Sequence, residues 1–144
     1  ESVLSGPGLA HLYAALRAQR GLAPSPVDAA GVEAAARGGD QTAVETIRLF
    51  WRLAARCAGD LALVFLAKGG VTLAGGVLPR LVDWLEPQSF QRAFSDKAPM
   101  ANLLARVPLR LLVDTDAVLA GLAALAAEPD AFALDYAARA WCKL

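Results

Sequence analysis

Residues 71–80 decide the expected fold, and they read Val-Thr-Leu-Ala-Gly-Gly-Val-Leu-Pro-Arg. The first four residues are apolar or β-branched, which predicts a short strand at 71–74. The glycine pair then allows a sharp turn, and Pro79 suits the first turn of a following helix. Such a turn can let backbone approach a flat ligand, while the start of the helix offers free N–H groups to an anion. Glycine can also serve the geometry of the turn alone, so this pattern by itself leaves both interpretations open.

A second strand is expected at residues 109–113, which read Leu-Arg-Leu-Leu-Val. The segment between the strands can hold a crossover that contains helices, which predicts a parallel pair. A sheet of only two strands is marginally stable, so we expect further strands from sequence that this chain lacks to complete it. The expected fold class is therefore α/β, rich in helices, with about two parallel strands.

The strongest helical signal lies at residues 42–65. Apolar side chains recur there in steps of three and four and predict one buried stripe: Val44, Ile47, Trp51, Ala54, Ala58, Leu61 and Phe65. Thr42 and Glu45 have the spacing of a capping box, and Gly69-Gly70 is expected to end the helix. A row of arginines on the opposite face could bind phosphate or simply be solvated: Arg48, Arg52 and Arg56.

Shorter helices are expected on both sides of this long helix. The first covers about 9–20, where apolar residues recur at helical spacing. The next is rich in alanine, with Ser25 as a plausible N-cap, Pro26 at the first helical position and Gly38-Gly39 at the end. Further helices are expected after Pro79 and at 90–94, 101–105, 117–127 and 132–143.

Composition excludes several classes of protein. The 144 residues are 56% hydrophobic and 19% charged, which is unlike a disordered chain. The 14 basic and 14 acidic residues give a formal net charge of zero, so the charge does not indicate binding to nucleic acid or to an anionic membrane. No apolar run approaches the ~20 residues of a membrane-spanning helix. Cys57 and Cys142 do not make a disulfide framework, so free thiols and a cytoplasmic location are expected.

Residues that carry chemistry are scarce. His11 is the only histidine, and without a thiol cluster near it no metal site is expected. The patterns G-x-S-x-G, H-E-x-x-H, C-x-x-C and Walker A are all missing, so no catalytic residue is predicted in this chain. Trp141 could be core or a contact in a homodimer. Because the chain starts at Glu1 rather than methionine, we expect a processed chain or a piece of a longer one.

Three blocks of the sequence resemble bacterial glucokinases, which are ATP-dependent sugar kinases of the actin-like superfamily. Residues 1–9, Glu-Ser-Val-Leu-Ser-Gly-Pro-Gly-Leu, resemble the E-x-V-L-S-G-P-G-L stretch of that family. Residues 73–80 resemble its adenosine segment, A-G-G-I-x-P-R. Residues 90–97, Phe-Gln-Arg-Ala-Phe-Ser-Asp-Lys, resemble its F-x-x-A-F-x-D-K block. The blocks occur in the order of the family, and the resemblance runs from residue 1 to about residue 124.

The resemblance implies specific ligand contacts. Glu1 would bind glucose hydroxyls, a task that suits a carboxylate acceptor. Gly75, Gly76 and Val77 would lie beside the adenosine of ATP. Arg80 would reach the ribose or a phosphate, although a surface role for Arg80 is an open alternative.

The resemblance also implies that the chain is only part of an enzyme. Residues 1–144 would be the carboxy-terminal portion of an actin-like (ribonuclease H-like) kinase lobe, with 128–144 as a helical extension. The D-x-G-G-T-N and G-T-G-x-G phosphate loops of the family, its N-D-F segment with the general base and its G-G-H glucose contact do not occur here. The parent protein would be a glucokinase that uses Mg²⁺ and ATP, whereas this chain alone would not catalyse the phosphorylation of glucose. An arginine that follows the Asp-Lys pair in the family is also missing, because this chain has Lys97-Ala98-Pro99.

Two alternatives of other kinds stay open alongside a kinase for another hexose. The first is a non-catalytic actin-like module that senses sugar, which could keep Glu1 and lack the aspartate. The second is an alanine-rich helical interaction domain. The expected ligands of the favoured interpretation are glucose and ATP, with no nucleic acid or membrane partner.

Overall fold

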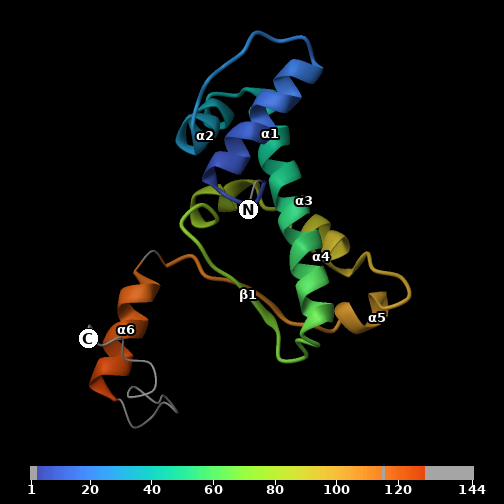
Figure 1. Ribbon diagram of the computed structural model, residues 1–144, viewed down its shortest axis with the longest axis vertical. Coiled ribbons are helices and arrows are strands. Elements are labelled where there is room, and N and C mark those ends of the chain that lie inside the picture. Colours follow the sequence, from blue (N-terminus) through green and yellow to red (C-terminus); the bar gives the residue numbers. More distant parts are fainter. Residues whose placement is uncertain (1–2, 115, 129–144) are drawn as a thin grey trace, which may run out of the picture. The chain divides into compact units, whose positions relative to one another are not determined.

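The computed structural model describes residues 3–114 and 116–128 (Figure 1). It divides into two compact units, Glu1–Val113 and Asp114–Leu144, and each is considered by itself. The first unit holds eight of the described elements: α1 (Gly6–Gln19), α2 (Ala29–Arg37), α3 (Gln41–Val64), β1 (Val71–Leu73), the 3-10 helix η1 (Pro79–Trp84), α4 (Pro87–Ser95), α5 (Ala101–Leu104) and β2 (Leu109–Leu111). The second unit holds α6 (Ala117–Ala127).

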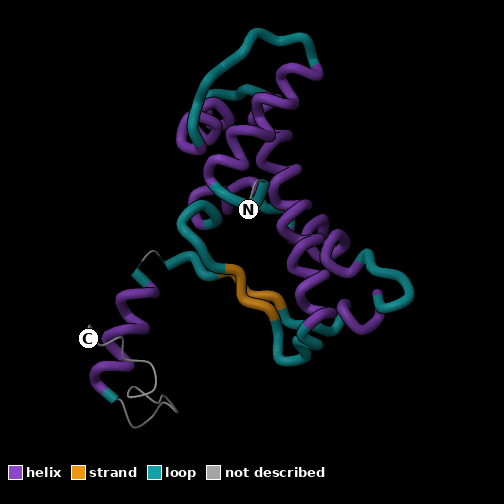
Figure 2. The backbone as a smooth tube through the Cα atoms, in the orientation of Figure 1, coloured by secondary structure: helices purple, strands orange, loops and turns teal. Residues whose placement is uncertain are grey.

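The two strands confirm the predicted parallel pair. Strand β1 lies beside β2, with Val71 opposite Leu109 and Leu73 opposite Leu111 (Figure 2). The Leu112 N–H donates to the Leu73 carbonyl at 2.9 Å, and this bond is at the carboxyl end of the pair. Both strands are shorter than predicted. Strand β1 ends at Leu73, just before the glycine bend, and β2 ends at Leu111, the residue that lies opposite Leu73.

Helix α3 forms the centre of the first unit, with α1, α2 and α4 packed against it (Figure 1). Ile47, Trp51 and Ala58 of the predicted stripe are buried. The end of the stripe was predicted wrongly, since Leu61 is 50% and Phe65 75% exposed. Alternating steps of three and four repeat every 3.5 residues on average, whereas a straight helix has about 3.6 residues per turn. Over several turns, the buried face of the helix therefore moves away from the predicted positions. At this end of α3 the buried positions are Ala55, Ala58, Gly59 and Ala62.

The close approach of α3 and α4 depends on one glycine. A Cβ added to Gly59 would lie 2.3 Å from the Phe94 carbonyl oxygen, well inside van der Waals contact. Phe94 itself is fully buried, and Phe90 of the same helix packs edge-on against Trp51 at 6.0 Å between ring centroids. The Trp51 indole N–H also donates to the Leu81 carbonyl at 3.0 Å, which ties η1 to the core.

Short polar side chains decide where the helices begin, and two predicted starts were wrong. Helix α3 is capped by Asp40, whose carboxylate accepts from the backbone N–H groups of Thr42 and Ala43, rather than by the predicted capping box. Helix α2 starts after Asp28, whose carboxylate accepts from the Gly31 N–H at 2.8 Å, rather than at Pro26. Aspartate satisfies the free N–H groups of a helix start at least as well as serine.

The end of α3 also differs from the prediction. The helix stops at Val64, and Leu66 follows with φ 47°, which is uncommon for a residue with a side chain. Gly70, with φ 119°, belongs instead to the turn that leads into β1. The segment after Pro79 is a 3-10 helix, and the helix predicted at 90–94 extends over Pro87–Ser95.

Two further predictions can be checked only in part. Cys57 is an exposed free thiol, while Cys142 and the helix predicted at 132–143 lie outside the described residues. Within residues 3–114 and 116–128, no helix combines the length and the apolar character needed to cross a membrane.

Candidate functional site

The glycine bend after β1 is open rather than packed. Gly75 has φ 143°, a conformation that favours glycine, whereas Gly76 does not have a positive φ. Both residues are exposed, and a Cβ added to either would meet no heavy atom within 4 Å. Backbone in this bend is therefore accessible to a ligand.

In space, the glycine bend lies near the start of α1. A Cβ added to Gly6 would lie 3.9 Å from a Val77 methyl carbon and 3.7 Å from the Ala29 Cβ. Val77 is half-buried and lies near the first turn of α1. The Ser5 side chain caps α1 by accepting from the Gly8 N–H at 3.0 Å. Residues far apart in sequence thus meet at one place.

A cavity of about 560 Å³ opens at this place. Its size falls in the range of small-molecule sites, about 300–1,000 Å³. Its walls come from one face of α1, from the segment that precedes and begins α2, and from η1: Gly6, Pro7, Ala10, His11, Ala14, Ser25, Pro26, Val27, Asp28, Ala29, Ala30 and Arg80. Most of this lining is apolar, with a few polar groups at its margin. That combination suits a ligand with a flat apolar body and a polar or anionic end.

Arg80 is the cationic group of the cavity. Its Nε lies 2.9 Å and its Nη2 lies 2.6 Å from the Glu33 Oε2 atom on α2. Arg80 is about half exposed. Its contacts with Glu33 use Nε and Nη2, and in the described part of the chain no protein group pairs with its Nη1 atom. A guanidinium in this state can still donate hydrogen bonds to an anionic ligand.

Helix α1 is held in place by a polar cluster at its other end. The Tyr13 hydroxyl donates to the Asp40 Oδ2 atom at 2.5 Å, and the Arg17 Nη1 atom lies 3.5 Å from the same carboxylate oxygen. The hydrogen bond from Tyr13 is the main reason why the pKa of Asp40 is lowered. Burial, and then the bond to Asp40, raise the pKa of Tyr13. The cluster fixes α1 against the start of α3 and so supports one wall of the cavity.

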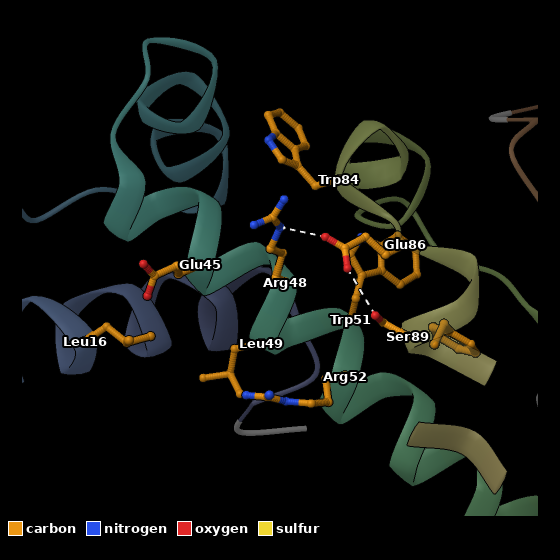
Figure 3. Close-up of a pocket in the computed structure, with 10 residues that line it drawn as sticks. Leu16, Glu45, Arg48, Leu49, Trp51, Arg52, Trp84, Glu86 and Ser89 are labelled. Atoms are coloured by element: carbon orange, nitrogen blue, oxygen red, sulfur yellow. Dashed lines mark hydrogen bonds and ion pairs between the residues drawn. The ribbon is translucent and has the colours of Figure 1, made fainter. Parts of the chain in front are cut away.

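A second cavity, of about 370 Å³, lies over α3 between α1 and α4 (Figure 3). Glu86 lies there between Arg48 and Ser89, with Arg48 Nε 3.1 Å from Oε1 and the Ser89 hydroxyl donating to Oε2 at 3.1 Å. Farther along α3, Arg56 pairs with Asp96 at 3.2 Å. The predicted arginine row is therefore an exposed helix face on which two of the three side chains are paired with acids.

The predicted site residues differ in their relation to the large cavity. Arg80 lines it, and Val77 lies near Gly6, which also lines it, whereas Gly75 and Gly76 are exposed and are not part of the lining. Glu1 lies outside the described residues. Within the described ranges no group of three or more histidine, cysteine, aspartate or glutamate side chains could hold a metal ion.

Sequence reasoning missed the partner of Arg80. Glu33 lies 47 positions away in a helix that reads as an ordinary alanine-rich segment. Its only local signal is the spacing of four residues to Arg37, which predicts a pair on the surface of α2 and nothing about η1.

Comparison with known proteins adds a consistent result. A family model described as Glucokinase matches residues 1–129. The glucokinase of Allorhizobium ampelinum is 39% identical over 142 residues, which cover 98% of this chain and 42% of that protein. The glucokinase of Sinorhizobium fredii is 42% identical over the same shares. A crystal structure of glucokinase from an Antarctic psychrotroph matches with a TM-score of 0.78 at 38% identity, covering 86% of this chain and 39% of that one. The chain thus spans about two fifths of the length of these relatives.

Proposed function

This chain belongs to the glucokinase family, and from that membership we propose that the complete protein phosphorylates glucose with ATP. The reaction transfers the γ-phosphoryl group of ATP to the 6-hydroxyl of glucose, yielding glucose 6-phosphate and ADP as in the first step of glycolysis. The chain contributes the carboxy-terminal portion of an actin-like kinase lobe, with residues 128–144 as a helical extension. The fold of the relatives and the parallel pair of β1 and β2 support this assignment.

The observation that carries the proposal is the open glycine bend, which is followed along the chain by Arg80 in the lining of a cavity of ligand size. Backbone without side chains at Gly75 and Gly76 lets a flat base come close, because no protein atom occupies the adjacent space. Val77 continues this surface toward α1, and Arg80 adds a cation at the margin of the cavity. An adenosine with attached phosphates has the apolar body and anionic end that such a lining suits. We therefore assign Gly75, Gly76 and Val77 to adenosine, and Arg80 to the ribose or a phosphate.

Glu1 supplies the contact with glucose in this proposal. A carboxylate accepts hydrogen bonds from two neighbouring sugar hydroxyls and so orients the 6-hydroxyl for attack. The group that accepts the hydroxyl proton, and the loops that bind the phosphates, belong to other parts of the complete protein. Mg²⁺ would enter with ATP, but the described residues show no ligand cluster for it, so no step is assigned to the metal in this chain.

The setting of the enzyme is part of the same proposal. We propose a cytoplasmic protein with glucose and ATP as its ligands and a homodimer as its assembly. The balanced charge of the chain supports the absence of nucleic-acid and membrane partners.

A coupled assay for glucose 6-phosphate on the complete protein tests the proposal. We expect turnover with glucose and ATP, and none from the 144-residue chain alone. Replacing glucose by fructose, mannose or an amino sugar identifies a kinase for another hexose if one of these is the better substrate. A protein that binds sugar without turning over any of them would instead be a sugar-sensing module, and the kinase proposal would be wrong.

The role of Glu1 has its own test in the complete protein. Glu1→Ala should reduce kcat/KM for glucose far more than it raises the KM for ATP, since Glu1 contacts only the sugar. Equal losses for both substrates would contradict the assignment of Glu1.

A further inference from the structure

We propose that Glu33 is a positioning residue for the nucleotide, acting through Arg80. Glu33 fixes the Arg80 guanidinium at the margin of the large cavity, so that the free end of this cation meets the ribose or phosphates. The inference rests on the proposed function, because it takes Arg80 as a contact for ATP.

The contacts of Glu33 show how this fixation works. The Oε2 atom accepts from both Nε and Nη2 of Arg80, at 2.9 and 2.6 Å, so it engages one edge of the guanidinium. The Oε1 atom accepts from the Arg37 Nε at 3.2 Å. Glu33 is only 16% exposed, whereas both arginines are about half exposed. A half-buried carboxylate with each oxygen engaged is more restricted than a lone surface glutamate.

Helix α2 also contacts the side chains at the other end of η1. The Arg37 Nη2 atom lies 3.0 Å from the Asp83 Oδ2 atom, and the Arg37 guanidinium lies over the Trp84 ring at 4.9 Å from its centroid. Two neighbouring arginines therefore link α2 to η1, one through Glu33 and one through Asp83. The carboxyl end of η1 is thus tied to α2 through Asp83, separately from the Glu33–Arg80 pair at its amino end.

Arginine loses much rotational freedom when it binds a ligand in one geometry. A partner that already holds one edge of the guanidinium reduces that loss, and this reduction strengthens ligand binding. The negative charge of Glu33 acts in the opposite direction, because it offsets part of the attraction between Arg80 and a phosphate. The two effects give opposite signs when Glu33 is neutralised. Positioning predicts weaker binding of ATP, and simple neutralisation predicts tighter binding.

The decisive variant is Glu33→Gln in the complete protein, which keeps the shape of the side chain and removes its charge. We expect the KM for ATP to rise about threefold to fivefold, the size of effect that the loss of the Glu33–Arg80 ion pair would give. The kcat should stay within about twofold and the KM for glucose should not change, because neither Glu33 nor its two arginine partners is assigned to glucose or to the transferred phosphoryl group. An unchanged or lower KM for ATP would overturn the inference.

Two further variants separate this role from a structural one. Asp83→Asn removes the partner that Arg37 uses on η1 but leaves the Glu33–Arg80 pair, so its KM for ATP should match the wild type. In an Arg80→Ala background, Glu33→Gln should cause no additional rise in KM, and a full additional rise would show that Glu33 does not act through Arg80. If Arg80→Ala alone leaves the KM for ATP unchanged, the assignment of Arg80 to the nucleotide fails, which is a failure of the proposed function itself.

Discussion

Substituting Gly76 by alanine separates a ligand role for the glycine bend from a role in folding. Gly76 does not have a positive φ, and an added Cβ would meet no protein atom within 4 Å. The folded backbone can therefore accept alanine without strain. Alanine also lowers the conformational entropy of the unfolded chain, so Gly76→Ala should stabilise the protein by about 0.4–1 kcal/mol.

The same methyl group should weaken the binding of ATP. If adenosine lies against the bend, the Cβ occupies space that the base needs, and one excess methyl in a packed contact costs about 1–3 kcal/mol. This range corresponds to a rise in the KM for ATP of about 5-fold to 150-fold. The kcat should change less, because Gly76 lies beside the adenosine rather than the transferred phosphoryl group.

The assay measures initial rates of glucose 6-phosphate formation in the complete protein, with ATP varied at saturating glucose, and thermal unfolding of the same samples. Gly69→Ala is the matched control, since Gly69 is also exposed, has no positive φ and has no protein atom within 4 Å of an added Cβ. Gly69→Ala should leave the KM for ATP unchanged. A Gly76→Ala enzyme with a KM for ATP within twofold of the wild type, and a stability like that of the control, would refute a nucleotide contact at the bend.

Two other outcomes concern the fold that supports the site. Asp40→Ala should destabilise the protein by about 2 kcal/mol, because it removes the cap of α3 and the acceptor of the Tyr13 hydroxyl. The pKa of Asp40 in the folded protein lies below its ordinary value of 3.8. The wild type should therefore lose the stability that the Asp40 carboxylate contributes as the pH falls through that lowered pKa. Urea titrations at decreasing pH should show a smaller loss of stability in Asp40→Ala. Gly59→Ala should destabilise by about 2–3 kcal/mol, since its Cβ would lie 2.3 Å from the Phe94 carbonyl oxygen, and an unchanged melting temperature would contradict this close packing.

The secondary structure was largely predictable from local patterns. The steps of three and four in α3, the β-branched start of β1 and the glycine pair are signals within a few residues, and all of them correspond to the observed elements. The ends of the helices were less predictable. Ser25, Thr42 and Asp40 are all plausible caps by composition, and only the geometry of the backbone N–H groups shows which side chain accepts from them.

Burial along α3 could be predicted only where the pattern and the packing agree. Ile47 and Trp51 are buried, as the periodic pattern predicts. Leu61 and Phe65 fit the same period, but α4 packs against Gly59, and the buried face at this end of α3 carries Ala62 instead, which leaves the larger side chains exposed. Hydrophobicity indicates a preference for burial, whereas the neighbouring helix decides which face is covered.

By itself, the sequence determined the parallel strands, the glycine bend between strand and helix, and the family to which the chain belongs. These features depend on residues that are adjacent or at a fixed spacing along the chain. Only the tertiary structure decided that the bend is open, that α1 and the start of α2 line a cavity with Arg80, and that Glu33 holds Arg80. The physical reason is that an ion pair or a cavity wall requires groups close in space, and the 47 positions between Glu33 and Arg80 leave no periodic trace in the sequence.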